Sequence, residues 1–179
     1  MKKVFIAGAT GWVGKELSKA IVASSDYTLV GGLSRSEENL SDILGLDQAV
    51  IPLFDSIAKA IEKVDFDILI DFTSPKIAKE NIIASIKNGK NSIVGTSGLS
   101  DLEYEEIGSL AEEKNVSVLA AGNFSITAVL LQRFSETAAK YIDHFEIIDY
   151  ASQKKVDAPS GTVAELAYRL SKIQKPVLD

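Results

Sequence analysis

The sequence has no cysteine and only one histidine, His144, among its 179 residues. Without cysteine the chain can form no disulfide, no thiolate metal site and no cysteine nucleophile. A single histidine does not supply the ligand set of a typical zinc site. His144 has the polar residues Asp143 and Glu146 nearby, which is typical of a histidine on the surface or in a turn. We therefore expect no metal centre and no histidine-rich active site.

The sequence also lacks a long hydrophobic run and an excess of positive charge. No apolar stretch approaches the roughly 20 residues that a membrane-spanning helix needs. The N-terminus resembles a short signal peptide, but glycines from Gly8 onward interrupt it, so it is better explained as a buried strand. The net charge of −6 argues against a general nucleic-acid surface. We expect a cytoplasmic protein that binds neither membranes nor nucleic acids.

A glycine-rich turn follows the first apolar stretch. Residues 4–7 are rich in strand formers, and Gly8–Gly14 reads G-A-T-G-W-V-G before a helical pattern over 15–23. Glycines let a backbone turn sharply and approach a pyrophosphate, and the helix N-terminus supplies N–H donors. The spacing favours a nucleotide-binding turn. The alternative is a tight strand-to-helix turn in which the glycines serve packing alone.

A second strand is expected over 27–33, and the residues after it bear on cofactor choice. A site that prefers NAD usually has an acidic residue here, which binds the ribose hydroxyls. This chain instead has Ser34, Arg35 and Ser36. An arginine can pair with a 2′-phosphate, and serines can donate hydrogen bonds to it. We therefore predict that the protein prefers NADPH, with NADH as the alternative cofactor. The negative charges of Glu37 and Glu38 nearby weaken this prediction. The other interpretation is a solvated polar loop.

Strands and helices then alternate along the chain, which predicts an α/β fold: a Rossmann-like doubly wound parallel sheet. In such sheets ligands bind beyond the carboxyl ends of the strands. Four polar or glycine-rich turns are expected there, over 8–14, 72–74, 95–98 and 122–125. The expected strands are 66–72, 91–94 and 116–120, the expected helices are 56–64, 77–87 and 102–113, and 50–53 is a short strand or a connector.

The pattern changes near Gly122, where we place a domain boundary. Residues 1–121 form the expected dinucleotide-binding domain, and 122–179 begin an α+β domain for substrate binding and oligomerisation. A helix over 125–139, with Val129, Leu130, Phe134 and Ala138 on its apolar face, precedes a strand over 145–150. These few elements do not enclose a core, so we expect that a C-terminal part of the protein is missing from this sequence.

Residues 155–162 read K-V-D-A-P-S-G-T and lead into a helical pattern. Ser160 is a suitable N-cap, and a helix N-terminus can hold a carboxylate. One interpretation is an anion site formed by Lys155, Ser160, Gly161 and Thr162. The other is a capped helix start with a solvated lysine.

Five motifs occur in order and together resemble one family. They are G-A-T-G-W-V-G, D-F-T-S-P from Asp71, G-T-S-G from Gly95, A-G-N-F-S from Ala121, and K-V-D-A-P-S-G-T, which is the most specific. This set resembles dihydrodipicolinate reductase (4-hydroxy-tetrahydrodipicolinate reductase), an NAD(P)H-dependent oxidoreductase of lysine biosynthesis that acts on a cyclic dicarboxylate. The resemblance covers nearly the whole chain. It implies a homotetramer in the complete protein.

The resemblance also implies roles for individual residues. Lys155, Ser160, Gly161 and Thr162 would hold a substrate carboxylate, and we expect Lys155 to be essential for turnover. The residues and the resemblance together predict the cofactor-binding residues Gly8, Ala9, Thr10, Gly11, Trp12, Val13, Ser34, Arg35, Ser36, Phe72, Thr73, Gly95, Thr96, Ser97, Ala121, Asn123 and Phe124.

One departure from the family pattern concerns the proton donor. The family usually has two histidines shortly before the lysine, whereas this chain has Ala151 and Ser152. Neither is a useful acid at neutral pH. Tyr150, Lys154, Lys155 or water could replace the missing acid. Three interpretations stay open: the family's own reaction with an altered acid, a related reductase with another substrate, and a non-catalytic NADPH-binding protein.

Overall fold

The computed structural model describes residues 1–35, 39–46, 50–150, 159–175 and 177. The chain divides into two compact units, Met1–Ala120 and Ala121–Asp179. The boundary expected from the sequence, after residue 121, lies one residue further along the chain.

The first unit contains a six-stranded sheet in which all neighbouring strands are parallel. The strands lie in the order β3-β2-β1-β4-β5-β6. This is the strand order of the Rossmann fold, so the predicted fold class is confirmed. Their bounds are β1 Lys2–Ala7, β2 Tyr27–Leu33, β3 Leu53–Phe54, β4 Ile68–Asp71, β5 Asn91–Val94 and β6 Val118–Ala120.

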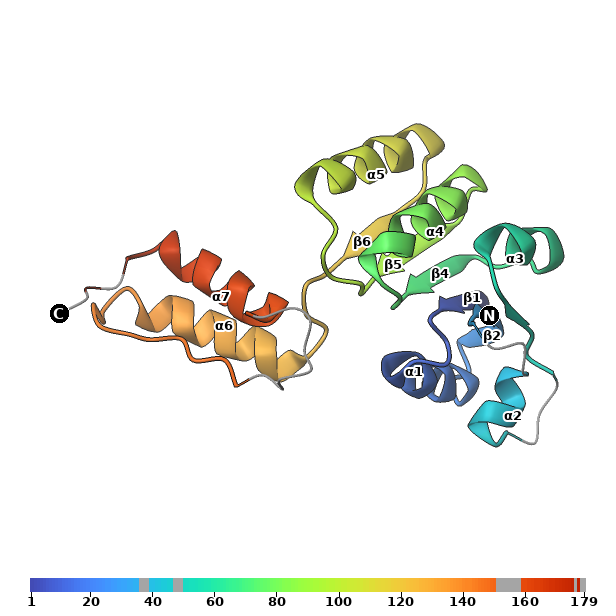
Figure 1. Ribbon diagram of the computed structural model, residues 1–179, viewed down its shortest axis with the longest axis horizontal. Helices are drawn as coiled ribbons and strands as arrows, with labels where there is room; N and C mark the ends of the chain where they lie inside the picture. The colour runs from blue at the N-terminus through green and yellow to red at the C-terminus, as the bar shows by residue number, and fades with distance from the viewer. Residues whose placement is uncertain (36–38, 47–49, 151–158, 176, 178–179) are drawn as a thin grey trace. The chain divides into compact units, whose positions relative to one another are not determined.

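Helices cover both faces of this sheet (Figure 1). Helices α1 (Trp12–Val22) and α2 (Leu40–Leu44) lie on one face. Helices α3 (Ile57–Lys63), α4 (Pro75–Lys87) and α5 (Asp101–Lys114) lie on the other. The strand order therefore reverses between β1 and β4, and open α/β sheets bind their ligands beside such a reversal.

The central strand β1 has one hydrophobic side chain after another because both of its faces are covered. Val4 and Ile6 belong to a core cluster with residues of α1 and α2. Phe5 and Ala7 point the other way and pack with residues of α3. Complete burial of a ring such as Phe5 contributes roughly 1.5–3 kcal/mol. The core thus holds the carboxyl end of β1 in a fixed position.

Most of the elements expected in the first unit are confirmed, with small shifts at their ends. Helix α1 begins three residues before the expected helix, and α4 begins two residues earlier, at Pro75, which suits the first helical turn. Strand β3 lies over Leu53–Phe54 rather than 50–53. The short helix α2 was missed. Among the described residues, no helix is long and apolar enough to cross a membrane.

The second unit contains α6 (Ile126–Ala138) and α7 (Gly161–Ser171), both close to their expected positions. The prediction of a strand over 145–150 is wrong, because these residues form no strand. No other strand occurs in the described part of this unit. Side chains there alternate between half-buried and exposed, but a strand also needs a hydrogen-bonded neighbour. The apolar face of α6 is largely exposed, with Phe134 at 67%.

Candidate functional site

A pocket of about 620 Å³ lies at the carboxyl ends of the strands in the first unit. Its walls come from the turns after β1, β2, β3 and β4 and from one side of α4. Several expected cofactor residues therefore meet at one place, although they are far apart in the sequence. The lining residues are Gly8, Thr10, Gly11, Leu33, Ser34, Arg35, Asp55, Ser56, Ile57, Phe72, Thr73, Ser74, Ile77, Glu80 and Asn81.

The turn after β1 leaves no room for a side chain at two of its glycines, Gly8 and Gly14. Gly8 has φ +82°, and a Cβ there would overlap the carbonyl oxygen of Phe72. A Cβ at Gly14 would overlap the carbonyl oxygen of Gly8, which also accepts a hydrogen bond from the Gly11 N–H at 2.9 Å. Only glycine at these positions allows the turn to fold so tightly against the next loop.

The N-terminus of α1 follows this turn directly. No side chain caps the helix, whose N-cap residue is Gly11, and its first turn carries no acidic residue. The positive end of the helix dipole is therefore not neutralised by a capping carboxylate. Trp12, the first residue of the helix, has 87% of its surface exposed. The arrangement suits an anionic group such as a pyrophosphate.

Two hydroxyl groups connect the glycine turn to the end of β2. The Oγ1 atom of Thr10 and the Oγ atom of Ser34 are 2.9 Å apart, within hydrogen-bond distance. The Ser34 N–H also donates to the carbonyl oxygen of Phe54 at 2.9 Å. Arg35 is exposed and lines the same pocket. A cation and a hydroxyl group thus stand where a Rossmann fold binds the adenosine ribose.

The remaining expected residues of the first unit lie around the pocket in different ways. Ala9 is fully buried in the core and its N–H donates to the carbonyl oxygen of Leu33, whereas Val13 is half-buried. Gly95, Thr96 and Ser97 follow β5 and do not line the pocket. Thr96 is nevertheless joined to Thr73, because its Oγ1 accepts a 2.8 Å hydrogen bond from the Thr73 N–H.

In the second unit, one hydrogen bond joins two of the expected motifs. The Asn123 Nδ2 atom donates to the Oγ1 of Thr162 at 3.1 Å, so the A-G-N-F-S segment contacts the start of α7. Ser160 is the N-cap of α7, and its Oγ accepts from the Val163 N–H at 3.4 Å. The Ser160 N–H donates to a carboxylate oxygen of Asp149 at 2.8 Å. The expected capped helix start is therefore present.

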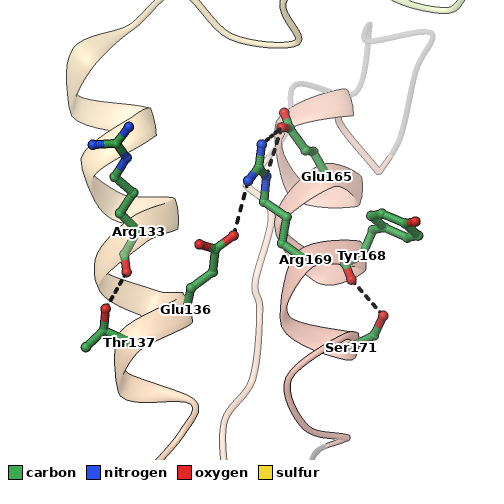
Figure 2. Close-up of polar contacts among 7 residues, drawn as sticks. All are labelled: Arg133, Glu136, Thr137, Glu165, Tyr168, Arg169 and Ser171. Atoms are coloured by element: carbon green, nitrogen blue, oxygen red, sulfur yellow. Dashed lines mark hydrogen bonds and ion pairs between the residues drawn. The ribbon is translucent and has the colours of Figure 1, made fainter.

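An arginine holds the two helices of this unit together (Figure 2). Arg169 Nη1 donates to Glu136 on α6 at 3.2 Å, while its Nε and Nη2 donate to Glu165 at 3.0 and 2.8 Å. The other oxygen of Glu165 lies so close to Gly122 that a Cβ there would be 2.7 Å from it. The segment at Gly122 and the first turns of α7 are thus packed together.

Five of the functional positions discussed above lie outside the described residues. They are Ser36, Lys154, Lys155 and the Ala151–Ser152 pair that replaces the family's histidines. In the described part of the chain, no group of three or more acidic or histidine side chains could hold a metal ion. Sequence reasoning missed eight lining residues of the pocket. They are Leu33, Asp55, Ser56, Ile57, Ser74, Ile77, Glu80 and Asn81.

Comparison with protein families gives matches over nearly the whole chain. Residues 2–124 match the model of the dihydrodipicolinate reductase N-terminus, and residues 127–176 match that of the dihydrodipicolinate reductase C-terminus. The 4-hydroxy-tetrahydrodipicolinate reductase of Bacillus velezensis is 34% identical over 174 residues, covering 96% of this chain and 65% of the relative. That of Syntrophomonas wolfei is 36% identical over 167 residues, covering 92% and 63%. The chain thus spans somewhat less than two thirds of these relatives.

Solved structures show the same likeness. A dipicolinate-bound dihydrodipicolinate reductase from Paenisporosarcina sp. TG-14 matches with a TM-score of 0.80 and 27% identity, over 100% of this chain and 69% of that one. A biliverdin reductase from Synechocystis, in complex with biliverdin and NADP+, matches with a TM-score of 0.60 and 18% identity, over 76% and 41%, and so shares the fold. Together with the sequence matches, this likeness shows that the chain belongs to the dihydrodipicolinate reductase family.

Proposed function

We propose that this chain belongs to an NADPH-dependent reductase that converts 4-hydroxy-tetrahydrodipicolinate to tetrahydrodipicolinate in lysine biosynthesis. The observation that carries the proposal is the pocket, which joins the glycine turn, Ser34, Arg35 and the loop after β4 in a chain of this family. The expected homotetramer and the cytoplasmic location stay predictions.

The residues around the pocket fit a dinucleotide. The backbone of Gly8 and Gly11 and the start of α1 would hold the pyrophosphate, since both glycines lack a side chain and no side chain caps the helix. Ser34 and Arg35 would hold the adenosine ribose and its 2′-phosphate. Thr73 and Thr96 would shape the nicotinamide end. When bound, NADPH supplies the hydride, and the protein supplies position and charge.

The substrate would be held by the second unit. The relative from Paenisporosarcina is described as binding dipicolinate, which is a cyclic dicarboxylate. We propose that Lys155 supplies positive charge to such a carboxylate, aided by Ser160, Gly161 and Thr162 at the start of α7. General acid catalysis is typically worth ~100- to 10,000-fold. Because Ala151 and Ser152 cannot provide it, Tyr150, Lys154, Lys155 or water would donate the proton.

The presence of Ala151 and Ser152 in place of the family's histidines favours a second candidate function. A reductase that lacks the usual histidines could act on another cyclic imine, or the protein could bind NADPH without catalysis. The lysine and the S-G-T segment argue against the non-catalytic alternative, since a protein that only binds the cofactor needs no anion site.

The test is to mix the protein with NADPH and freshly generated 4-hydroxy-tetrahydrodipicolinate and to follow the loss of reduced nicotinamide. We expect turnover, and we expect Lys155→Ala to reduce kcat/KM by roughly 100-fold. Lys172→Ala, at an exposed position after α7, is the matched control and should retain turnover. Tight NADPH binding without turnover would favour the second candidate, whereas absence of NADPH binding would refute the proposal.

A further inference from the structure

Asp71, at the end of β4, carries a carboxylate that is completely buried, with 0% of its surface exposed. The rest of this strand, Ile68, Leu69 and Ile70, is apolar. Burying a carboxylate in such surroundings is costly unless hydrogen bonds compensate for the lost water. An apolar residue would fill the same space at lower cost, so stability alone does not explain an aspartate here.

Four hydrogen bonds from uncharged donors compensate the Asp71 carboxylate. Its Oδ1 accepts from the Thr73 N–H at 3.0 Å, from Thr73 Oγ1 at 2.7 Å and from Thr96 Oγ1 at 2.7 Å. Its Oδ2 accepts from Asn81 Nδ2 at 2.9 Å. The four donors come from the loop after β4, the loop after β5 and helix α4. One carboxylate therefore connects three separate segments.

Thr96 contacts both Asp71 and Thr73 in this network. Its hydroxyl hydrogen is directed to Asp71, and its oxygen accepts from the Thr73 N–H at 2.8 Å. The hydroxyl is thus engaged within the protein and orients both loops. Phe72 adds a packing contact, because a Cβ at Gly95 would overlap its ring. The loops after β4 and β5 are consequently fixed against each other by hydrogen bonds and by packing.

We propose that Asp71 is a positioning residue that fixes the loops 72–74 and 95–97 at the nicotinamide end of the cofactor site. Asp71 itself contacts no ligand; it acts through Thr73, which lines the pocket, and through Thr96. This inference rests on the proposed function, because it assigns these loops to the nicotinamide. Asp71 has no role in binding the adenosine half of the cofactor in this proposal.

The test compares two ligands on the wild-type protein and on the Asp71→Asn variant by titration calorimetry. NADPH has a nicotinamide, and 2′-phospho-ADP-ribose lacks it. We expect NADPH affinity to fall about tenfold in the variant, since a hydrogen-bond network around a charge is lost. The affinity for 2′-phospho-ADP-ribose should stay within about twofold. The fluorescence of bound NADPH at saturation, which depends on the surroundings of the reduced ring, should also differ from that of the wild type.

An equal loss of affinity for both ligands would mean that the substitution damages the fold of the whole site. Unchanged affinity for both would mean that Asp71 has no positioning role. Either result overturns the inference. Failure of the wild-type protein to bind NADPH would instead overturn the proposed function. The matched control is Asp67→Asn, near the start of the same strand, where Asp67 accepts a 2.8 Å hydrogen bond from the Lys3 N–H. It should leave both affinities unchanged.

A second pair of variants keeps the inference testable if Asp71→Asn does not fold. Thr96→Val keeps the shape of the side chain but removes the hydroxyl that contacts Asp71, whereas Thr96→Ser keeps the hydroxyl. We expect Thr96→Val to lose NADPH affinity selectively and Thr96→Ser to behave like the wild type. Equal behaviour of the two variants would overturn the inference.

Discussion

Arg35 and Asp55 place opposite charges on the wall of one pocket. Asp55 is already engaged by Lys59, whose Nζ is 2.6 Å from its carboxylate, and this contact lowers the pKa of Asp55. The acidic residue that often binds the ribose of NAD is absent at the end of β2, where Ser34 and Arg35 stand instead. The predicted preference for a cofactor with a 2′-phosphate thus depends on the balance between the charges of Arg35 and Asp55.

Replacement of Arg35 by alanine tests this balance. We expect the dissociation constant of NADPH to rise about tenfold, because a charge-assisted contact with the phosphate is lost. The dissociation constant of NADH should change little, and it serves as the internal control. Titration of both cofactors measures the effect. An equal loss of affinity for NADPH and NADH in the variant would contradict the predicted preference. Comparable affinities of the wild-type protein for the two cofactors would contradict it as well.

Individual pocket residues could be predicted from the sequence only where a motif marks them. Gly8, Thr10 and Gly11 belong to a recognisable turn, and all three line the pocket. Ile77 and Asn81 carry no such signal, since they are ordinary members of an amphipathic helix. Their contribution depends on how α4 packs against the sheet, and one sequence does not specify that packing.

At the scale of the elements, one exposed aspartate connects the amino ends of three neighbouring strands, β1, β4 and β5, whereas the pocket lies at the carboxyl ends. Asp65, just before β4, lies 2.9 Å from the Nζ of Lys3 on β1 and 2.8 Å from that of Lys90, just before β5. Lys90 and then Lys3 lower the pKa of Asp65 from its usual 3.8 to about 2. A carboxyl whose pKa is lower in the folded protein stabilises the fold above its usual pKa. That contribution is lost as the pH falls through about 2.

Asp65→Asn should therefore lower the melting temperature slightly near neutral pH, since exposed pairs contribute little. The difference from the wild type should shrink as the pH falls from about 4 towards about 2. Thermal unfolding across this range, at low and high salt, measures it. Asp26→Asn, an exposed aspartate before β2, is the control. A difference that stays constant with pH would show that the ion pairs are not its cause.

The sequence predicted elements well where hydrophobic period and glycine turns agreed, as for β1, α1 and β5. Helix α2 was missed although Asn39 caps its start, with Oδ1 accepting from the Ser41 N–H, and Gly45 ends it in a left-handed conformation. Five residues are too few for a hydrophobic period to be recognised. The strand prediction over 145–150 was wrong for a different reason, because here a local pattern was present. Its alternation is present, but pairing depends on a neighbour that a local pattern does not reveal.

At the scale of the whole molecule, the two units differ in how much they bury. Among the residues that the structure describes, the three hydrophobic core clusters consist of residues of the first unit. In the second unit, large apolar side chains such as Phe134 and Tyr168 are exposed. The hydrophobic stabilisation of the described residues is thus concentrated in Met1–Ala120, which also contains every residue that lines the pocket.

We therefore expect residues 1–120, produced alone, to fold and to bind 2′-phospho-ADP-ribose within about twofold of the affinity of the whole chain. Circular dichroism and calorimetry check the two parts of this prediction. The ligand that lacks nicotinamide is chosen because Asn123 and Phe124, expected at the nicotinamide end, are absent from this fragment. A folded fragment with much weaker binding would mean that the second unit contributes to the adenosine half of the site.

Trp12 gives this protein a property that is useful in the laboratory. It is the chain's single tryptophan, it is 87% exposed, and it begins α1 immediately after the glycine turn. Light emitted after selective excitation of tryptophan therefore originates at one known place, beside the proposed pyrophosphate site. The protein carries its own optical reporter, so compounds that compete for this turn could be screened without attaching a dye.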